Sequence, residues 1–202
     1  MNNELLFIKD KFNENLKQYK KHFKNFEKIE NYETKWSYST SIDFYPYESS
    51  MYGFKPSKLY NTNPLSENSK ETIIQNRFRN KEIFYSFNYH KKEWGSEFYF
   101  DDEKNNKMRL FYEDQNEEGK ILLSQLKYKI IDKNIVKKVY SYMYDHDMEK
   151  ETFFIFDYFY EQNKIIKIVR SDYFKIHPVV IFDKTNNFNI KKIKNRIRPH
   201  FI

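Results

Sequence analysis

One short segment combines residue types that can do acid–base or metal chemistry. Asp145, His146 and Asp147 are consecutive, and Glu149 follows closely. Carboxylates and an imidazole on one turn can bind a hard cation or exchange protons with a substrate. These residues would suit a metal-dependent hydrolase at the 145–149 turn. Acidic residues and histidine are also common in ordinary hairpin turns, and we favour that interpretation.

Other catalytic arrangements are missing from the sequence. Phosphate-binding loops need several glycines at fixed spacing, whereas Gly53, Gly95 and Gly119 lie far apart. Without cysteine there is no thiol nucleophile, thiolate metal ligand or disulfide. The five histidines are His22, His90, His146, His177 and His200. No two of them have metal-ligand spacing on one element. We therefore predict a non-enzymatic binding protein with no cofactor, no catalytic residues and no metal ligands.

Acidic residues gather on two neighbouring turns in the middle of the chain. They are Asp101, Asp102, Glu103, Glu113, Asp114, Glu117 and Glu118. An acidic surface suits a basic protein partner, because complementary charge speeds and directs docking. We take these residues as the candidate partner-binding surface, and a set of solvated turns is the alternative.

Positive charge is concentrated near the C-terminus. The net charge is +7, and the basic residues of the tail include Lys191, Lys192, Lys194, Arg196 and Arg198. Aromatic residues make up 20% of the chain, and aromatic strands interleaved with Lys and Arg can stack nucleic-acid bases. A nucleic-acid-binding module is therefore an alternative function, and a merely solubilising tail is the other interpretation.

The apolar runs are too short for a membrane or a secretion signal. The stretch from Leu5 to Ile8 is followed at once by Lys9 and Asp10. A signal peptide needs a longer apolar run behind a basic start, and a membrane span needs roughly 18 apolar residues. We predict a cytoplasmic protein with no membrane partner.

The N-terminal segment has the apolar spacing of a helix. One stripe is formed by Leu5, Ile8, Phe12, Leu16, Tyr19, Phe23, Phe26 and Ile29, and lysines lie between these positions. Steps of three and four residues keep a stripe on one helix face. We predict one amphipathic helix over residues 1–31 that lies across a sheet with its single apolar face buried.

Beyond residue 32 the apolar period changes to two. Trp36, Tyr38, Thr40, Ile42 and Phe44 alternate with polar residues, as in a half-buried strand. Similar segments recur to residue 182 with short polar turns between them, which is typical of an antiparallel sheet. The absence of alanine and the many Tyr and Phe residues also favour strands.

Two parts of this region are less regular. Residues 46–70 are rich in Pro, Ser and Asn and predict an irregular loop, the kind of segment that often carries function. Residues 71–80 fit either a short strand or a helical turn. Near the C-terminus, Val179–Phe182 and Asn189–Ile193 are expected to form a last hairpin.

Together these patterns predict one α+β domain over residues 1–202. The long N-terminal amphipathic helix is expected to pack on a strongly twisted antiparallel β-meander of about eight strands over 32–182. A basic C-terminal segment covers 183–202. The alternation alone leaves open whether the sheet stays open, forms a sandwich or closes on itself.

A degenerate repeat accompanies the strands: two aromatic residues, then an acid, a polar turn, a lysine and an aliphatic residue. The copies are Phe98-Tyr99-Phe100-Asp101 before Lys107-Met108, Phe111-Tyr112-Glu113-Asp114 before Gly119-Lys120-Ile121, and Tyr158-Phe159-Tyr160-Glu161 before Asn163-Lys164-Ile165. A weaker copy is Val180-Ile181-Phe182-Asp183. The acid and the Asn or Gly suit a tight turn, and the aliphatic residue starts the returning strand.

This pattern resembles the tyrosine–aspartate repeats of bacterial Rhs-type proteins, which carry a Tyr-Asp-x-x-Gly-Arg-Leu core. The resemblance covers about residues 98–183 and is loose: Glu often replaces Asp, Lys replaces Arg, and Gly119 alone keeps the glycine. Similar hairpin chains occur in small cytoplasmic immunity proteins encoded beside polymorphic toxins. The resemblance thus implies an immunity protein that neutralises a cognate toxin by covering its surface. The expected partner is a basic toxin domain.

Overall fold

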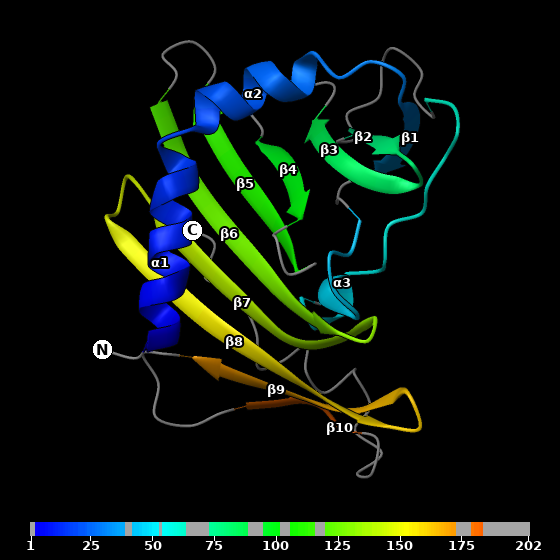
Figure 1. Ribbon diagram of the computed structural model, residues 1–202, viewed down its shortest axis with the longest axis vertical. Coiled ribbons are helices and arrows are strands. Elements are labelled where there is room, and N and C mark those ends of the chain that lie inside the picture. Colours follow the sequence, from blue (N-terminus) through cyan, green and yellow to red (C-terminus); the bar gives the residue numbers. More distant parts are fainter. Residues whose placement is uncertain are drawn as a thin grey trace.

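The described part of the chain folds into one antiparallel sheet. In the computed structural model the described residues are 3–38, 42–52, 54–63, 73–88, 95–101, 106–115, 120–172 and 179–183. The sheet has ten strands in the order β1 to β10, so each strand pairs with the next one along the chain (Figure 1). The strands are β1 (Glu33–Tyr38), β2 (Ile73–Arg79), β3 (Glu82–Asn88), β4 (Ser96–Asp101), β5 (Lys107–Gln115), β6 (Lys120–Asp132), β7 (Ile135–Asp145), β8 (Lys150–Glu161), β9 (Lys164–Asp172) and β10 (Val179–Asp183).

The predicted meander is confirmed, with two more strands than the expected eight or so. The segment that fitted either a strand or a helical turn forms β2. At the C-terminal end β10 pairs with β9, and the second arm of the hairpin expected there, 189–193, lies outside the described residues.

Three of the connections are tight two-residue turns. Asn80-Lys81, Lys133-Asn134 and Gln162-Asn163 all have positive φ values, between 47° and 66°. Positive φ at both central residues is the geometry of a type I′ turn, whose twist matches that of the flanking strands. Each of these turns contains an asparagine, the residue that tolerates this conformation best after glycine.

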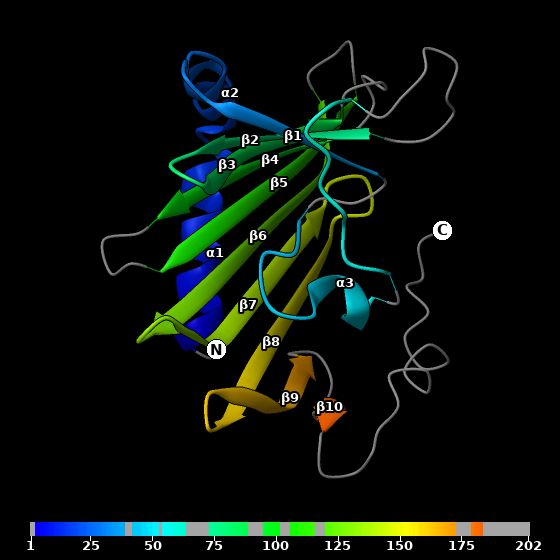
Figure 2. The ribbon, with the colours of Figure 1, turned by 90° about the vertical axis from the view of Figure 1, so that its right-hand side faces the viewer.

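Register shifts accompany these turns and give the sheet its curvature. The ladders shift between Arg77 and Phe78, between Ile130 and Ile131, and between Phe159 and Tyr160. A β-bulge bends its strand and increases the local twist. Figure 2 shows the result, a sheet whose strands rotate steadily from β1 to β10.

The expected single N-terminal helix is two helices in the structure. The first, α1, spans Asn3–Leu16, and α2 spans Tyr19–Glu27. The regular ladder stops at Gln18, whose N–H donates to the carbonyl of Asn15 at 2.9 Å, three residues back. The correction has a physical cause: a straight helix of this length would extend about 40 Å and leave the twisted sheet. The break lets α2 run across the top of the sheet in Figure 1, with Phe26 against β3 and β4.

The helices cover one face of the sheet and the first core lies beneath them. From α1, Leu5, Ile8 and Phe12 are buried against β5 to β8. From α2, Phe26 packs against Phe84 and Phe98, with ring centroids 6.0 and 5.1 Å apart. Within the described residues no helix is both long and apolar enough to cross a membrane.

A second core lies on the opposite face, under the segment predicted to be an irregular loop. That segment contains a short helix, α3 (Glu48–Met51), and Tyr60 forms a backbone bridge with Trp36 at 2.8 Å in each direction. Tyr45 and Met51 are buried against β7 and β8. Figure 2 shows α1 and α3 on opposite sides of the sheet.

Candidate functional site

A cluster of buried charges lies between α3 and the sheet. Arg109 on β5 and Lys127 on β6 are direct neighbours in the ladder, and both point toward α3. Their exposed fractions are 4% and 6%, and Glu48 of α3 is 6% exposed. One carboxylate oxygen of Glu48 accepts from both basic groups. Its other oxygen accepts the backbone N–H of Phe44 at 2.7 Å.

A second carboxylate continues the cluster along β4. Glu97 lies 3.6 Å from the Arg109 guanidinium, and the hydroxyl of Tyr99 donates to Glu97 at 2.7 Å. Burial opposes the charge of Arg109, but Glu48 and Glu97 outweigh it, so the pKa of Arg109 is raised. The guanidinium Nε is buried and has no hydrogen-bond partner among the described residues.

The two basic groups stabilise the charged form of the buried Glu48 carboxyl. Burial by itself would raise the pKa of the Glu48 carboxyl, but Arg109 and Lys127 overcome it, and the net pKa is lowered. Adjacent cations on neighbouring strands would repel each other without this carboxylate. Glu48 therefore fixes α3 on the sheet.

The α3 segment is held in place at its start as well. One carboxylate oxygen of Asp43 accepts both the backbone N–H of Ser49, at 3.0 Å, and its hydroxyl. This contact closes the loop that carries Glu48 and Phe44. The position of Phe44 in turn shapes the cavity beside the cluster.

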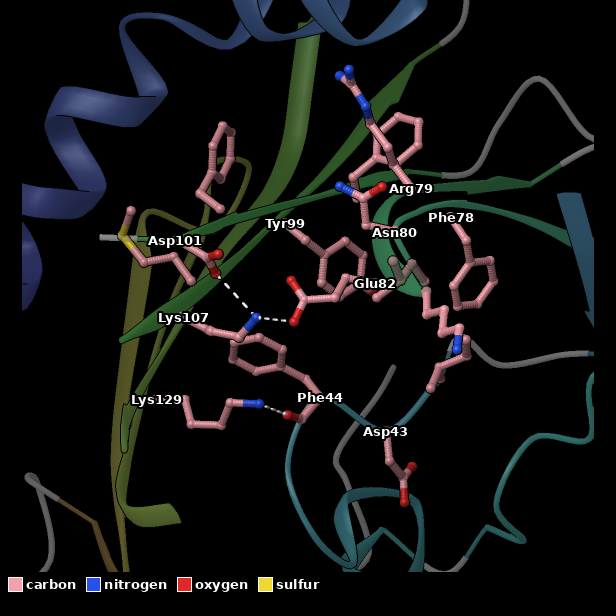
Figure 3. Close-up of a pocket in the computed structure, with 16 residues that line it drawn as sticks. Asp43, Phe44, Phe78, Arg79, Asn80, Glu82, Tyr99, Asp101, Lys107 and Lys129 are labelled. Atoms are coloured by element: carbon pink, nitrogen blue, oxygen red, sulfur yellow. Dashed lines mark hydrogen bonds and ion pairs between the residues drawn. The ribbon is translucent and has the colours of Figure 1, made fainter. Parts of the chain in front are cut away.

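The cavity has a volume of about 520 Å³ and opens beneath the β2–β3 turn (Figure 3). Apolar and aromatic residues form much of its wall: Ile42, Phe44, Phe78, Ile83, Phe84, Tyr99, Phe100 and Met108. Polar and charged residues complete it: Asp43, Arg79, Asn80, Lys81, Glu82, Asp101, Lys107 and Lys129. The size lies in the range of ligand sites, and the aromatic wall beside charged groups could hold a ligand that is both apolar and charged.

Lys107 is paired with two carboxylates in this cavity. Its amine lies 2.9 Å from Glu82 and 3.3 Å from Asp101, as the dashed lines in Figure 3 show. Burial opposes its charge, but the bonds to the two carboxylates dominate and raise the pKa of Lys107.

Lys129 has a different environment, although it lies on the neighbouring strand. Its amine donates to the carbonyl oxygen of Phe44 at 2.7 Å and lies 4.4 Å from the centre of the Phe44 ring. Among the described residues no carboxylate lies within ion-pair distance of it. Burial, and then the charge of Lys107, lower the pKa of Lys129 to about 8.

The candidate acidic residues that the structure describes lie at the two ends of one strand. Asp101 lies near the start of β5, beside Lys107. Glu113 and Asp114 lie at the other end of the same strand, roughly 20 Å away at the usual rise of a strand. The remaining members, Asp102, Glu103, Glu117 and Glu118, lie outside the described residues.

The far end of β5 belongs to another acidic group. Glu113 and Asp145 both pair with Leu123, from opposite sides of β6, and Asp147 and Glu149 follow on the exposed β7–β8 turn. We call Glu113, Asp145, Asp147 and Glu149 the acidic rim. Burial and the nearby charge of Asp145 raise the pKa of Glu113. Among the described residues, no base forms an ion pair with Glu113.

The 145–149 turn has the contacts of a structural turn. One oxygen of Asp145 accepts the N–H groups of Asp147 and Met148, at 3.1 and 2.9 Å. His146 bonds to the hydroxyl of Ser124, and burial lowers its pKa. In the described ranges no group of three or more His, Asp or Glu side chains is arranged to hold a metal ion.

The nucleic-acid alternative gains little from the described residues. Lys191, Lys192, Lys194, Arg196 and Arg198 lie outside them. Of the arginines in the strands, Arg109 is buried in the charge cluster, and Arg77 lies over the rings of Tyr32 and Tyr85. These arginines are therefore already engaged within the protein.

Sequence reasoning missed the charge cluster and the cavity. Arg109 follows Met108 and precedes Leu110, so the alternation places it on the face opposite these apolar residues. From the sequence alone, that face is expected to be exposed to solvent. The available signal was weak: basic residues at three inward positions, 109, 127 and 129, on two adjacent strands. Glu48 lies far away in sequence, within the predicted loop.

Comparisons with protein-family models, with curated proteins and with solved structures found no match to this chain. The structure by itself defines a mostly antiparallel β protein with short helices, a buried charge cluster and an adjoining cavity.

Proposed function

We propose that this protein is a non-enzymatic immunity protein that neutralises a cognate toxin by binding and covering its surface. The observation that carries the proposal is the acidic rim, a group of carboxylates at one end of the sheet. In it Glu113 and Asp145 lie close enough for one charge to raise the pKa of the other group.

The rim suits a basic protein partner. Carboxylates held near one another raise the electrostatic energy of the free protein, and a cationic partner would relieve it. Complementary charge also raises the association rate, which matters when a toxin must be captured quickly. The loose likeness of residues 98–183 to tyrosine–aspartate repeats supports the same proposal.

The geometry of the rim also fits binding better than catalysis. Its turn is stabilised by its own backbone contacts, and the imidazole of His146 is bonded to Ser124.

The test uses the product of the gene that adjoins this one. Co-expression should protect a host cell from that product, and the two purified proteins should bind with an affinity that falls as salt rises. If the neighbouring product is harmless, or if the two proteins do not bind, the proposal is wrong.

A variant with fewer charges tests whether the partner binds at the acidic rim. We expect Glu113→Gln with Glu149→Gln to slow association about tenfold at low salt, because rim charges act mainly on the on-rate. The matched control is Asp132→Asn with Glu161→Gln, exposed acids on turns at the opposite end of the strands. Stopped-flow or surface-binding kinetics would measure both, and an equal effect of the two variants would remove the rim from the proposal.

A further inference from the structure

We propose that the cavity beneath the β2–β3 turn is a binding site for a small aromatic carboxylate whose charged group pairs with Lys129. The site is separate from the acidic rim, and the inference goes beyond the toxin-neutralising function. It stands on the geometry of the cavity and on the contacts of its charged groups.

The charged groups of the cavity are not all equivalent. Lys107 is held by Glu82 and Asp101, and Asp43 is occupied by Ser49. Behind the wall, Arg109 and Lys127 are compensated by Glu48. Lys129 has a carbonyl and an aromatic ring as its partners instead, so it is the half-buried base best placed to take an external anion.

The charge balance favours a ligand with one negative charge. Basic side chains in the lining exceed acidic ones by one: Arg79, Lys81, Lys107 and Lys129 against Asp43, Glu82 and Asp101. The lowered pKa of Lys129 reflects burial first and the charge of Lys107 second, so its amine is partly desolvated and lies near another cation. An anion in the cavity would stabilise the charged amine and raise the pKa of Lys129.

The walls favour a flat aromatic body behind the anionic group. Figure 3 shows Phe44 beside Lys129 and Phe78 on the opposite side of the cavity, and the centre of the Tyr99 ring lies 6.1 Å from that of Phe44. The volume of about 520 Å³ accommodates a fused two-ring molecule. Such a ligand would stack on aromatic walls while its carboxylate reaches Lys129.

The first experiment titrates the full chain with 2-naphthoate at about pH 6.5 and follows binding by calorimetry. We expect saturable binding of one ligand per chain. The neutral analogue 2-naphthamide should bind about tenfold or more weakly, since it cannot form the charged pair. Absence of binding, or equal affinity for the two probes, would overturn the proposal.

The second experiment assigns the charge to Lys129. Lys129→Met keeps most of the length of the side chain and removes the amine, and it should weaken naphthoate binding about tenfold or more. Lys137→Met is the matched control, because Lys137 is an exposed lysine that lies over the ring of Tyr160, away from the cavity. Equal affinities of the two variants would contradict the assignment.

A measurement on the unaltered protein guards against a variant that fails to fold. In nuclear magnetic resonance spectra of protein that carries carbon-13-labelled lysine, the pKa of Lys129 should rise when naphthoate is added, because the carboxylate stabilises the ammonium. Affinity should then fall about tenfold or more between about pH 6.5 and pH 9.5, as free Lys129 loses its proton. An unchanged pKa would refute the site.

Discussion

At the scale of single residues, the unusual feature is a set of buried charges in a protein rich in aromatic side chains. Removing two basic groups from water costs several kcal/mol each unless a carboxylate compensates them. Glu48 does so for Arg109 and Lys127. The contacts join α3 to the middle of the sheet, so one side chain controls the position of a whole segment.

We expect Glu48→Gln to lower the free energy of unfolding by about 3–5 kcal/mol, because it leaves two cations buried without a counter-charge. Urea denaturation followed by circular dichroism would measure the change. The control is Glu14→Gln, which removes an exposed ion pair with Lys11 at 4.0 Å and should cost less than about 1 kcal/mol. If Glu48→Gln cost no more than this control, the cluster would not hold α3.

The same cluster predicts how stability depends on pH. The pKa of Glu48 is lower in the folded protein than its ordinary value of 4.5. A group of this kind contributes stability above its unfolded pKa and loses that contribution as pH falls through its folded pKa. The difference between the native protein and Glu48→Gln should therefore shrink below about pH 4.5, and a difference that stays constant would contradict the assignment.

At the scale of elements, the break between α1 and α2 lets one apolar stripe follow a twisted surface. Ile8 and Phe12 lie over the central strands, and Phe26 lies over β3 and β4. Polar contacts fix the ends of α1: Glu4 accepts from Lys138 and Tyr140, and the Asn15 carbonyl accepts from Tyr112. The burial of the stripe supplies most of the binding of these helices.

We expect Ile8→Ala to destabilise the protein by about 2–5 kcal/mol, because the side chain is fully buried and its removal leaves a cavity. Leu6→Ala is the matched control on the same helix. Leu6 is 38% exposed, and its loss should cost less than about 1 kcal/mol. Equal losses in thermal or urea unfolding would show that α1 does not pack on the sheet as described.

At the scale of the whole molecule, each strand pairs with its neighbours in sequence. The longest strands, β6, β7 and β8, lie in the half of the sheet that α1 covers on one face and the α3 segment on the other. Such strands can open only when the core is lost, whereas strands near the ends of the sheet open locally.

Amide hydrogen exchange should follow this arrangement. We expect the slowest exchange in β6 and β7, at rates set by global unfolding, and exchange faster by about tenfold or more in β1 and β10. Mass spectrometry of peptic fragments or two-dimensional spectra would give the rates. Uniform protection across the ten strands would show that the sheet opens only as a single unit.

The sequence by itself determined most of the local structure of this protein, although the strand expected from Trp36 to Phe44 ends at Tyr38. Alternating apolar residues such as Ile83, Tyr85 and Phe87 fix strands, and short polar turns fix their sequential pairing, because both depend on neighbours along the chain. The stripe from Leu5 to Phe26 likewise fixed helical structure, but not the break at Gln18, which depends on the twist of a sheet formed later in the chain.

Tertiary structure alone decided the candidate sites. Glu48 meets Arg109 and Lys127 across 61 and 79 residues of sequence, and no periodic pattern encodes contacts over such separations. Tertiary structure also separated Asp101 from Glu113 and brought Glu113 beside Asp145 instead. Alternation predicts that a charged residue on a strand faces solvent. Whether it is buried depends on the segment that packs over that face, which the strand's own sequence does not specify.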